Sequence, residues 1–343
     1  MHALRLIADR DLRITEADPP PPPGPGEAQI AIRAVALNHI DVWGWRGMAF
    51  AKRSLPLTVG AEAVGEVVAL GEGVAGLRPG QLVVPYGGMT CGTCKECRAG
   101  RDNLCENVAG VRGFHADGFA QGLLNMPARL LVPVPHGVAV EDAACASITF
   151  GTVQHMLFDN AKLEPGETVL VHAAGSGIGT AAVRMAKAIG CTVIGTVGDA
   201  VKAEKAKALG CDHVVNYTTD RFESVARRVT GKRGVDVVFE HVGASTWQGS
   251  MLSLRMGGRL VTCGSTSGVS AETNLMMLFQ RQLRLIGSFG CTLRNIADSL
   301  DKMAAGVRPV LDTVLPLERF EEGLARLESR QVFGKIVVTL PPA

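Results

Sequence analysis

The chain has 343 residues, of which 47% are hydrophobic, and its 35 basic and 33 acidic residues leave a net charge of +2. This length suits two domains better than a single core. Charges so evenly balanced exclude a protein whose main partner is nucleic acid or an anionic membrane surface. No apolar run approaches the ~20 residues that a membrane span requires. We therefore expect a globular protein whose substrate is a small molecule.

The amino terminus and the cysteines predict a cytoplasmic location. Polar residues typical of a strand follow Met1 at once, which is not the pattern of a signal peptide. Nine cysteines are an odd number, and four of them fall within residues 91–105. Both features favour reduced thiols and a metal site over a secreted disulfide framework.

Residues 1–85 read as short strands separated by turns, for example at 29–35 and 63–70. Strands without long intervening helices favour an antiparallel, barrel-like domain. The prolines at 19–23, followed by Gly24, Pro25 and Gly26, predict a stiff polyproline connector on the surface. A docking motif for another protein is the alternative interpretation of that run.

Four cysteines follow at short spacing, Cys91, Cys94, Cys97 and Cys105. Four thiolates spaced in this way can surround one tetrahedral zinc ion. With all four cysteines used and no open coordination position, the predicted zinc is structural rather than catalytic. Four unrelated buried cysteines or an iron–sulfur cluster are the alternatives.

The stretch 167–210 predicts a nucleotide-binding βαβ unit. An apolar run at 168–171 leads into a turn of small residues at 173–179 and then into a helical pattern that ends at Gly190. Glycines in such a turn let the backbone approach a pyrophosphate, whose charge the helix amino terminus meets. Ala174 replaces the first glycine of the usual G-x-G-x-x-G pattern.

Alternating strands and helices continue beyond this unit. Strands are expected at 191–194, 214–217, 235–240, 259–264 and 283–287, with helices at 222–229, up to 256 and at 275–280. Residues 290–343 read as a helix, a strand at 310–315, a helix at 318–329 and a final strand at 335–340. The expected fold class is α/β, with a Rossmann doubly wound parallel sheet at 147–289. A separate antiparallel domain is expected from residues 1–146 and 290–343.

This order of parts resembles the zinc-type medium-chain dehydrogenase/reductase superfamily. The resemblance covers essentially the whole chain, and the cysteine spacing matches the superfamily's structural zinc lobe, here residues 91–105. It implies that the first domain is a GroES-like antiparallel β-barrel catalytic domain. It also implies a nicotinamide cofactor, a small-molecule substrate and assembly into a homodimer or homotetramer.

The departures from the family pattern bear on the chemistry. Alcohol dehydrogenases of the superfamily usually hold a catalytic zinc by an early cysteine, a Gly-His-Glu motif and a later cysteine. This chain has Asn38 at the first position and Ala61 in place of the histidine, so that only Glu62 and Cys145 match. Ile40 stands where the family has a proton-relaying hydroxyl. We therefore expect no catalytic zinc, since such a site typically needs three protein ligands.

A site without this metal favours reduction of an activated double bond over oxidation of a plain alcohol. Zinc activates a hydroxyl as an alkoxide, whereas charge on a carbonyl or quinone oxygen can be met by hydrogen-bond donors alone. The pattern formed by Asn38 and Asp41 is similar to the metal-free quinone and enoyl reductases of the superfamily. Asn38 is the first candidate for polar contact with the substrate, and Thr149, whose position lies near the nicotinamide in the family, is another. His39 is a candidate proton donor. Alternatively, Asn38 and Asp41 brace the loop and His39 is solvated or packed.

The resemblance also implies the cofactor contacts. An acid at the end of the second strand would favour NAD, but that position is Val197, while Lys202 and Tyr217 match residues that contact the 2′-phosphate of NADP. Asp199 argues for NAD, so that NADP(H) is favoured and NAD(H) is possible. The remaining expected cofactor contacts are Thr149, Ala174, Gly175, Ser176, Gly177, Ile178, Gly179, Val242, Cys263, Gly264, Ser288 and Lys335.

Three functions are therefore considered. The first is an NAD(P)H-dependent reductase of quinones, enones or enoyl thioesters with one structural zinc per chain. The second is an alcohol dehydrogenase or aldehyde reductase with a displaced zinc held by Cys145, Glu62 and His39. The third is a nucleotide-binding protein without turnover.

Overall fold

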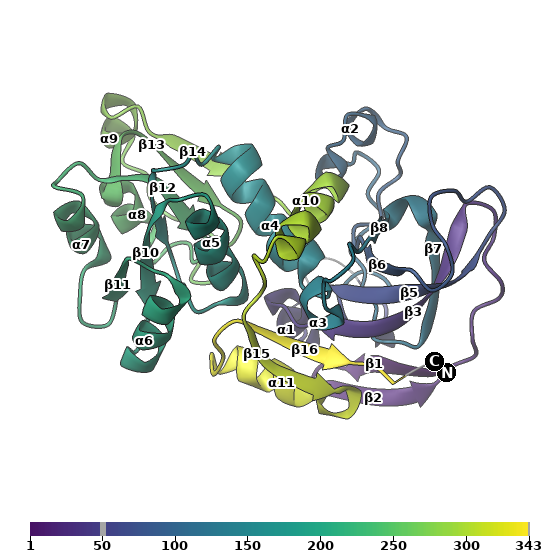
Figure 1. The fold of residues 1–343 in the computed structure, drawn as a ribbon. Coiled ribbons are helices and arrows are strands. Elements are labelled where there is room, and N and C mark those ends of the chain that lie inside the picture. The colour runs from purple at the N-terminus through teal and green to yellow at the C-terminus, as the bar shows by residue number, and fades with distance from the viewer. Residues whose placement is uncertain (49–52, 342–343) are drawn as a thin grey trace. The chain divides into compact units, whose positions relative to one another are not determined.

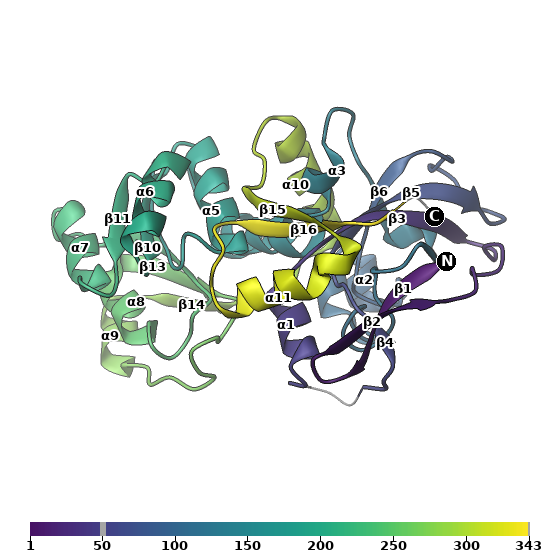
Figure 2. The ribbon, with the colours of Figure 1, turned by 90° about the horizontal axis from the view of Figure 1, so that it is seen from below.

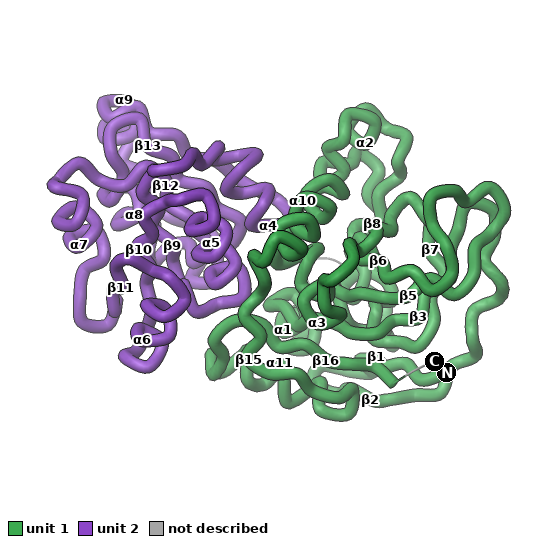
Figure 3. Tube along the Cα trace, in the orientation of Figure 1, with its two compact units in different colours: residues 1–151, 291–343 green, residues 152–290 purple. Residues whose placement is uncertain are grey.

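The computed structural model describes residues 1–48 and 53–341 and divides into two compact units (Figures 1 and 3). Unit 1 contains residues 1–151 and 291–343, and unit 2 contains residues 152–290. The sequence placed the corresponding boundaries at 146/147 and 289/290. Within the described part of the chain, no helix has the length and apolar character needed to cross a membrane.

Unit 1 is built on two sheets. A three-stranded sheet has the order β2-β1-β4, and a larger sheet has the order β15-β16-β3-β5-β6-β8, with β7 also pairing with β3. All the pairs are antiparallel except β15 with β16. The expected antiparallel domain is confirmed. The strands are β1 (His2–Ala8), β2 (Asp11–Glu16), β3 (Glu27–Ala36), β4 (Leu57–Thr58), β5 (Ala63–Leu70), β6 (Leu82–Pro85), β7 (Leu123–Pro127), β8 (Leu131–Pro133), β15 (Leu311–Pro316) and β16 (Lys335–Thr339).

The helices of unit 1 are short apart from the last two. They are α1 (His39–Trp45), α2 (Lys95–Arg98), α3 (Val140–Ala143), α10 (Leu293–Ala304) and α11 (Phe320–Glu328), with a π-helical turn at Ala146–Phe150. Helix α11 packs against α1, although the two lie at opposite ends of the chain (Figure 2). The carboxyl-terminal segment thus returns to the first domain, and β16 joins its sheet beside β3.

Unit 2 contains a six-stranded parallel sheet with the order β11-β10-β9-β12-β13-β14. This is the order of a Rossmann sheet, whose direction of winding reverses beside its first strand, β9. All residues of β9 and β12 are buried, in keeping with their largely apolar composition, although β12 also contains Asp236 and Glu240. The strands are β9 (Thr168–Val171), β10 (Thr192–Val197), β11 (His213–Asn216), β12 (Val235–Glu240), β13 (Leu254–Thr262) and β14 (Arg284–Gly287).

Helices cover both faces of this sheet. Helices α5 (Gly177–Ala188) and α6 (Ala200–Leu209) pack together on one face, and α7 (Phe222–Val229) and α8 (Trp247–Ser253) pack together on the other (Figure 2). Helix α4 (Gly151–Gln154) precedes the sheet, and α9 (Leu275–Gln280) precedes β14. The doubly wound arrangement is confirmed.

One element boundary differs from the expectation. The helix expected to reach residue 256 ends at Ser253, and β13 begins at Leu254. Leu254 is fully buried and pairs with Val235 of β12. This long-range pairing overrides the helical periodicity of the sequence. The local pattern does not show it, so the sequence placed the end of the helix too late.

Candidate active site and metal centre

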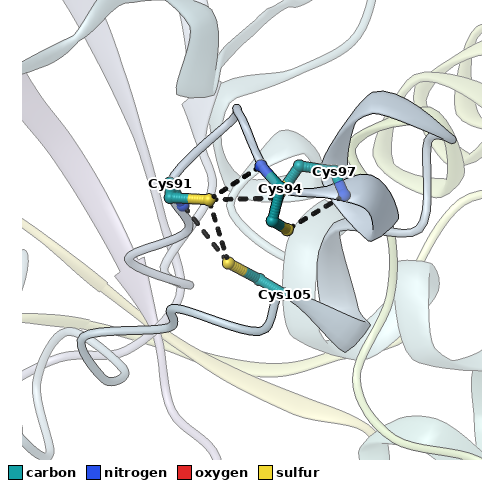
Figure 4. A group of neighbouring side chains, drawn as sticks. All are labelled: Cys91, Cys94, Cys97 and Cys105. Atoms are coloured by element: carbon teal, nitrogen blue, oxygen red, sulfur yellow. Dashed lines mark hydrogen bonds between the residues drawn. The ribbon is translucent and has the colours of Figure 1, made fainter.

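The four cysteines predicted to bind zinc come together in unit 1 (Figure 4). All four ligand atoms lie within 4.8 Å of one another. The Sγ atom of Cys91 is 3.6 Å from that of Cys105 and 4.0 Å from that of Cys97. Zinc–sulfur bonds of about 2.3 Å in a tetrahedron place the sulfurs about 3.8 Å apart. The cluster therefore has the dimensions of a tetrathiolate zinc site.

Backbone groups of this lobe prepare two of the four thiols for a cation, whereas burial raises the pKa of the Cys97 thiol to about 12. The backbone N–H groups of Thr93 and Cys94 point at the Cys91 sulfur and lower the pKa of its thiol to about 5. Cys97 N–H points in the same way at the Cys94 sulfur, at 3.4 Å, and lowers the pKa of that thiol as well. Hydrogen bonds to the charged form of a thiol favour the thiolate, which is the form that binds zinc.

A second polar cluster in unit 1 is centred on the Glu62 carboxylate, which is fully buried. Lys335, only 3% exposed, places its Nζ atom 3.1 Å from Glu62 Oε2. Thr149 donates its backbone N–H to Oε1 at 2.7 Å and its hydroxyl to Oε2 at 2.9 Å. Asn38 Nδ2 also donates to Oε2, at 2.9 Å. The carboxylate thus has four donors from three side chains and one backbone group.

Lys335 and Asn38 have no donor left over in this arrangement. The Lys335 ammonium donates to Leu37 O at 2.6 Å, to Asn38 Oδ1 at 2.8 Å and to Glu62 Oε2. An ammonium has three N–H donors, so all of them are used. The second N–H of the Asn38 amide donates to Ala36 O at 3.0 Å. The cluster is satisfied internally, and all the donors of Lys335, an expected cofactor contact, are directed at protein oxygens.

Asp41 caps helix α1 from inside the core. Its carboxylate accepts from Asn38 N–H at 2.8 Å and from Ala61 N–H at 3.1 Å. Burial raises its pKa to about 7, against the opposing effect of these hydrogen bonds and of the Lys335 charge. The bracing role considered for Asn38 and Asp41 is therefore the one that their contacts describe. His39 lies exposed at the first turn of the same helix, with its ring 6.3 Å from that of Trp43.

The residues considered for a displaced zinc do not form a cluster. Cys145 is buried, its thiol lies 3.6 Å from Glu141 O, and burial raises the pKa of that thiol. The Glu62 oxygens are already occupied, whereas His39 is exposed. Within residues 1–48 and 53–341, the four cysteines are the only group of three or more such ligands close enough to hold a metal.

The glycine turn of unit 2 is shaped by close backbone contacts. Ser176 caps α5 by accepting from Gly179 N–H at 3.0 Å. A Cβ atom on Gly179 would collide with Ala173 O, so a glycine is required there. Ala174 replaces a glycine because β10 makes room for it: a Cβ atom on Gly195 would lie 2.9 Å from the Ala174 Cβ. The turn thus keeps the tight connection that a pyrophosphate-binding βαβ unit needs.

The residues expected to select between NADP and NAD gather after β10. Asp199 caps α6 by accepting from Lys202 N–H at 2.7 Å, and the Lys202 ammonium lies 4.0 Å from the same carboxylate. Tyr217 is half exposed and its hydroxyl lies against Gly198. Val197 is buried. A cation and an acid therefore lie side by side after β10.

The other expected contacts follow the carboxyl ends of the sheet. Val242 follows β12, Cys263 and Gly264 follow β13, and Ser288 follows β14, where it accepts from Asn160 Nδ2 at 3.0 Å. Gly175, Gly177 and Ile178 lie between the carboxyl end of β9 and the first turn of α5, on the same side of the sheet. Thr149, in contrast, lies in unit 1 with the Glu62 cluster.

A buried network behind this edge was not anticipated from the sequence. Glu240 accepts from Val242 N–H, Gly243 N–H and the hydroxyls of Thr246 and Ser250. His172 lies 2.9 Å from the Ser250 hydroxyl, and burial lowers its pKa to about 4. The sequence contains one indication of this network, the glutamate at the end of the run that forms β12. A charge in such a run needs buried partners.

Comparison with known proteins supports this architecture. The alcohol dehydrogenase GroES-like domain family matches residues 24–136, and the zinc-binding dehydrogenase family matches residues 177–305. An acryloyl-coenzyme A reductase from Metallosphaera sedula is 32% identical over 91% of this chain and 92% of that protein. A quinone oxidoreductase from Salmonella typhimurium is 31% identical over 76% of this chain and 72% of that protein. A crystal structure of an NAD-dependent alcohol dehydrogenase is 39% identical, with a TM-score of 0.92 over 99% of this chain and 100% of that chain.

A Rossmann unit together with a GroES-like unit that carries a four-cysteine lobe defines a two-domain dehydrogenase or reductase. The chain belongs to the zinc-type medium-chain dehydrogenase/reductase superfamily, and it is an oxidoreductase of that type. The resemblance stated from the sequence is confirmed.

Proposed function

We propose that this protein is an NAD(P)H-dependent reductase of activated carbon–carbon double bonds, with an enoyl thioester, an enone or a quinone as substrate. The observation that carries the proposal is the buried Lys335–Glu62 ion pair, at 3.1 Å. The pair includes Glu62, and Lys335 also donates to Asn38. Asn38, Ala61 and Glu62 occupy positions at which the superfamily's alcohol dehydrogenases hold a catalytic zinc. Relatives of this chain include reductases of an enoyl thioester and of quinones.

The charge of this cluster fits the proposal. The Lys335 cation is compensated by Glu62, and every ammonium hydrogen is directed at a protein oxygen. Such a pair presents no free positive charge that would stabilise the alkoxide of a plain alcohol. A double bond conjugated to a carbonyl needs less help, because its own carbonyl oxygen takes up the developing charge and hydrogen-bond donors can meet it.

We assign the residues of unit 1 two roles. Asn38, Asp41 and Thr149 hold the walls of the site through the Glu62 cluster and the α1 cap. The side-chain donors of Asn38 and Thr149 are directed at protein oxygens, and the Asp41 carboxylate accepts from two backbone N–H groups. His39 is exposed at the start of α1 and is the proposed source of the proton that completes reduction. An imidazole is suited to this step because its unperturbed pKa is about 6.5.

The nucleotide is proposed to bind at the carboxyl edge of the unit 2 sheet. A reduced nicotinamide supplies the hydride when bound. The Ser176–Gly179 turn and the amino terminus of α5 would hold the pyrophosphate, and Val242, Cys263, Gly264 and Ser288 would line the same edge. We favour NADP(H), because Lys202 and Tyr217 border the place of the 2′-phosphate and Val197 offers no acid.

The four-cysteine lobe is proposed to hold one structural zinc ion. The sulfur separations of 3.6 and 4.0 Å suit tetrahedral coordination. All nine cysteines are free of disulfides, in agreement with the proposed cytoplasmic location.

Unit 2 also carries a surface suited to self-association. Strand β14 is one of the two edge strands of the sheet, and among the described residues it pairs with β13 alone. Leu275, Met276 and Phe279 of the adjacent α9 are 60–69% exposed. Edge strands and exposed apolar patches promote pairing with another chain. We propose a homodimer or homotetramer, which light scattering of the purified protein would test.

The decisive experiment compares acceptors on one preparation. Oxidation of NADPH and of NADH would be followed with an enoyl thioester, a quinone, an enone and a saturated aldehyde. We expect turnover with the activated double bonds and little with the aldehyde. Turnover of the aldehyde alone would overturn the proposal in favour of an aldehyde reductase, the alternative to which the 39% identical alcohol dehydrogenase points. Tight NADPH binding without any turnover would indicate a non-catalytic nucleotide-binding protein.

The zinc content of the same preparation separates the reductase from the alcohol dehydrogenase by a second measurement. One zinc per chain fits the reductase, and two fit an alcohol dehydrogenase with a second site. A Lys335→Met variant tests whether the ion pair sets acceptor specificity, and Lys187→Met is the matched control. Lys187 pairs with Asp212 at the surface of unit 2, at 2.8 Å, so its loss should leave acceptor specificity unchanged.

A further inference from the structure

Two adjoining hollows lie in unit 2 at the amino ends of β12, β13 and β14. One has a volume of about 580 Å³ and is lined by Arg227, Lys232, Arg233, Arg255, Met256 and Arg281. The other has a volume of about 470 Å³ and is lined by Ser224, Arg227, Arg228, Gly231 and Lys232. Arg227 and Lys232 belong to both. We call their combined lining the basic hollow. Because the glycine turn follows the carboxyl end of β9, the basic hollow lies at the opposite edge of the parallel sheet.

The positive charges of the basic hollow are mostly uncompensated. Asp236 pairs with Arg233 at 2.8 Å and with Arg255 in a shorter contact, and Glu167 lies 4.0 Å from Arg255. Across the described residues, Arg227, Arg228, Lys232 and Arg281 make no ion pair with an acidic side chain. The whole chain has a net charge of only +2, so this concentration of charge is local.

Arg281 shows that these like charges act on one another. Its guanidinium is held by a short hydrogen bond to Leu254 O, and its own carbonyl accepts from Gly257 N–H at 2.8 Å. Burial and the neighbouring Arg227 charge both lower the pKa of Arg281. Arg227 and Arg228 lie in the last turn of α7, where the helix dipole attracts cations. That dipole amounts to roughly half a unit charge, which does not offset four uncompensated cations.

We propose that the basic hollow is a second anion site, separate from the nicotinamide nucleotide site, and that it binds an anion of two or three linked phosphates. Guanidinium groups offer paired N–H donors that match phosphate oxygens. Both hollows are open to solvent, so the charges rather than enclosure would hold the anion. Met256, 67% exposed, adds an apolar rim beside the charges. The inference is independent of the proposed reductase function, because no residue of the basic hollow takes part in that site.

The test is a calorimetric titration of the full-length protein with inorganic tripolyphosphate, carried out with the nicotinamide nucleotide site saturated by NADPH. A parallel titration with a nucleoside triphosphate distinguishes a free oligophosphate from one carried on a nucleoside. Binding should weaken as salt rises, because it depends on charge. Binding that disappears when NADPH is added would place the phosphates at the glycine turn and overturn the proposal.

Matched variants locate the site. The double variant Arg227→Gln and Lys232→Gln removes the two cations shared by both hollows. The double variant Lys162→Gln and Arg184→Gln removes two exposed charges elsewhere in unit 2. We expect the first to weaken tripolyphosphate binding at least tenfold and the second to change it less than twofold. Equal effects would overturn the proposal, as would a duplex oligonucleotide that binds through Arg227 and Lys232 while tripolyphosphate does not. If the first double variant fails to fold, the single variant Arg227→Gln takes its place, and we expect it to bind tripolyphosphate about threefold more weakly.

Discussion

The Lys335 ammonium lies 3.1 Å from the Glu62 carboxylate, although the two residues are 273 positions apart. The pairing of β16 with β3 accounts for the contact, since Val337 faces Ala36 and Lys335 therefore reaches Leu37 and Asn38. Both charges are buried, so each depends on the other for compensation. The carboxyl-terminal strand thus supplies the cation at the centre of the candidate site.

Replacement of Lys335 by Met should destabilise unit 1 strongly. Removing one partner of a buried ion pair leaves the other charge unpaired, which typically costs about 3–5 kcal/mol. Urea unfolding at neutral pH would measure the loss. Adding Glu62→Gln to the Lys335→Met variant should recover part of it, because the uncompensated charge is gone. A double variant no more stable than the single one would contradict a charge-based origin.

The pH dependence of stability should report the buried Asp41. Its pKa is raised from 3.8 to about 7 by burial, so the folded state holds this proton more tightly than the unfolded state. Its contribution to stability is full below pH 4 and is lost as the pH rises to about 7, a change on the order of 4 kcal/mol. In an Asp41→Asn variant this loss should vanish. Parallel stability–pH curves for the two proteins would show that Asp41 does not titrate in this window.

Loss of one zinc-lobe cysteine should remove the metal and leave the nucleotide site intact. Cys105→Ser replaces a sulfur that lies 3.6 Å from Cys91, and a hydroxyl is a poor ligand for a tetrathiolate zinc. We expect zinc content, measured by elemental analysis, to fall from one ion per chain towards none, with a lower unfolding temperature. Cys211→Ser, in unit 2 and outside the lobe, is the control that should keep its zinc.

Cofactor preference should respond to the charges after β10. Lys202→Ala removes the cation beside the expected 2′-phosphate and should raise the KM for NADPH about tenfold, equal to 1.4 kcal/mol, with little effect on NADH. Asp199→Asn should shift the preference towards NADPH. The amide keeps an oxygen to accept from Lys202 N–H at the α6 cap and loses only the negative charge. Steady-state kinetics with both nucleotides would check this. If Lys202 were only a solvated helix charge, its replacement would change the KM for NADPH no more than the KM for NADH.

Local patterns determined much of the fold. The largely apolar runs at 168–171 and 235–240 became β9 and β12, because strands buried on both faces are mostly apolar. The small-residue turn at 173–179 and the helix after it are likewise local. The four cysteines span only fifteen residues, so their spacing alone brought them together.

Tertiary structure decided the contacts of the site residues. Asn38 looked like a substrate donor, but its amide hydrogens are directed at Ala36 O and Glu62. Ala174 looked like a missing glycine until Gly195, on the neighbouring strand, proved to make room for it. Lys335 was expected to contact the cofactor, and β16 brings its ammonium to a carboxylate far away in the chain. Motif spacing identifies residues that are near one another in the sequence. The partners of a buried polar or charged group, in contrast, are the residues that sheet pairing places beside it, and these can lie far away in the chain.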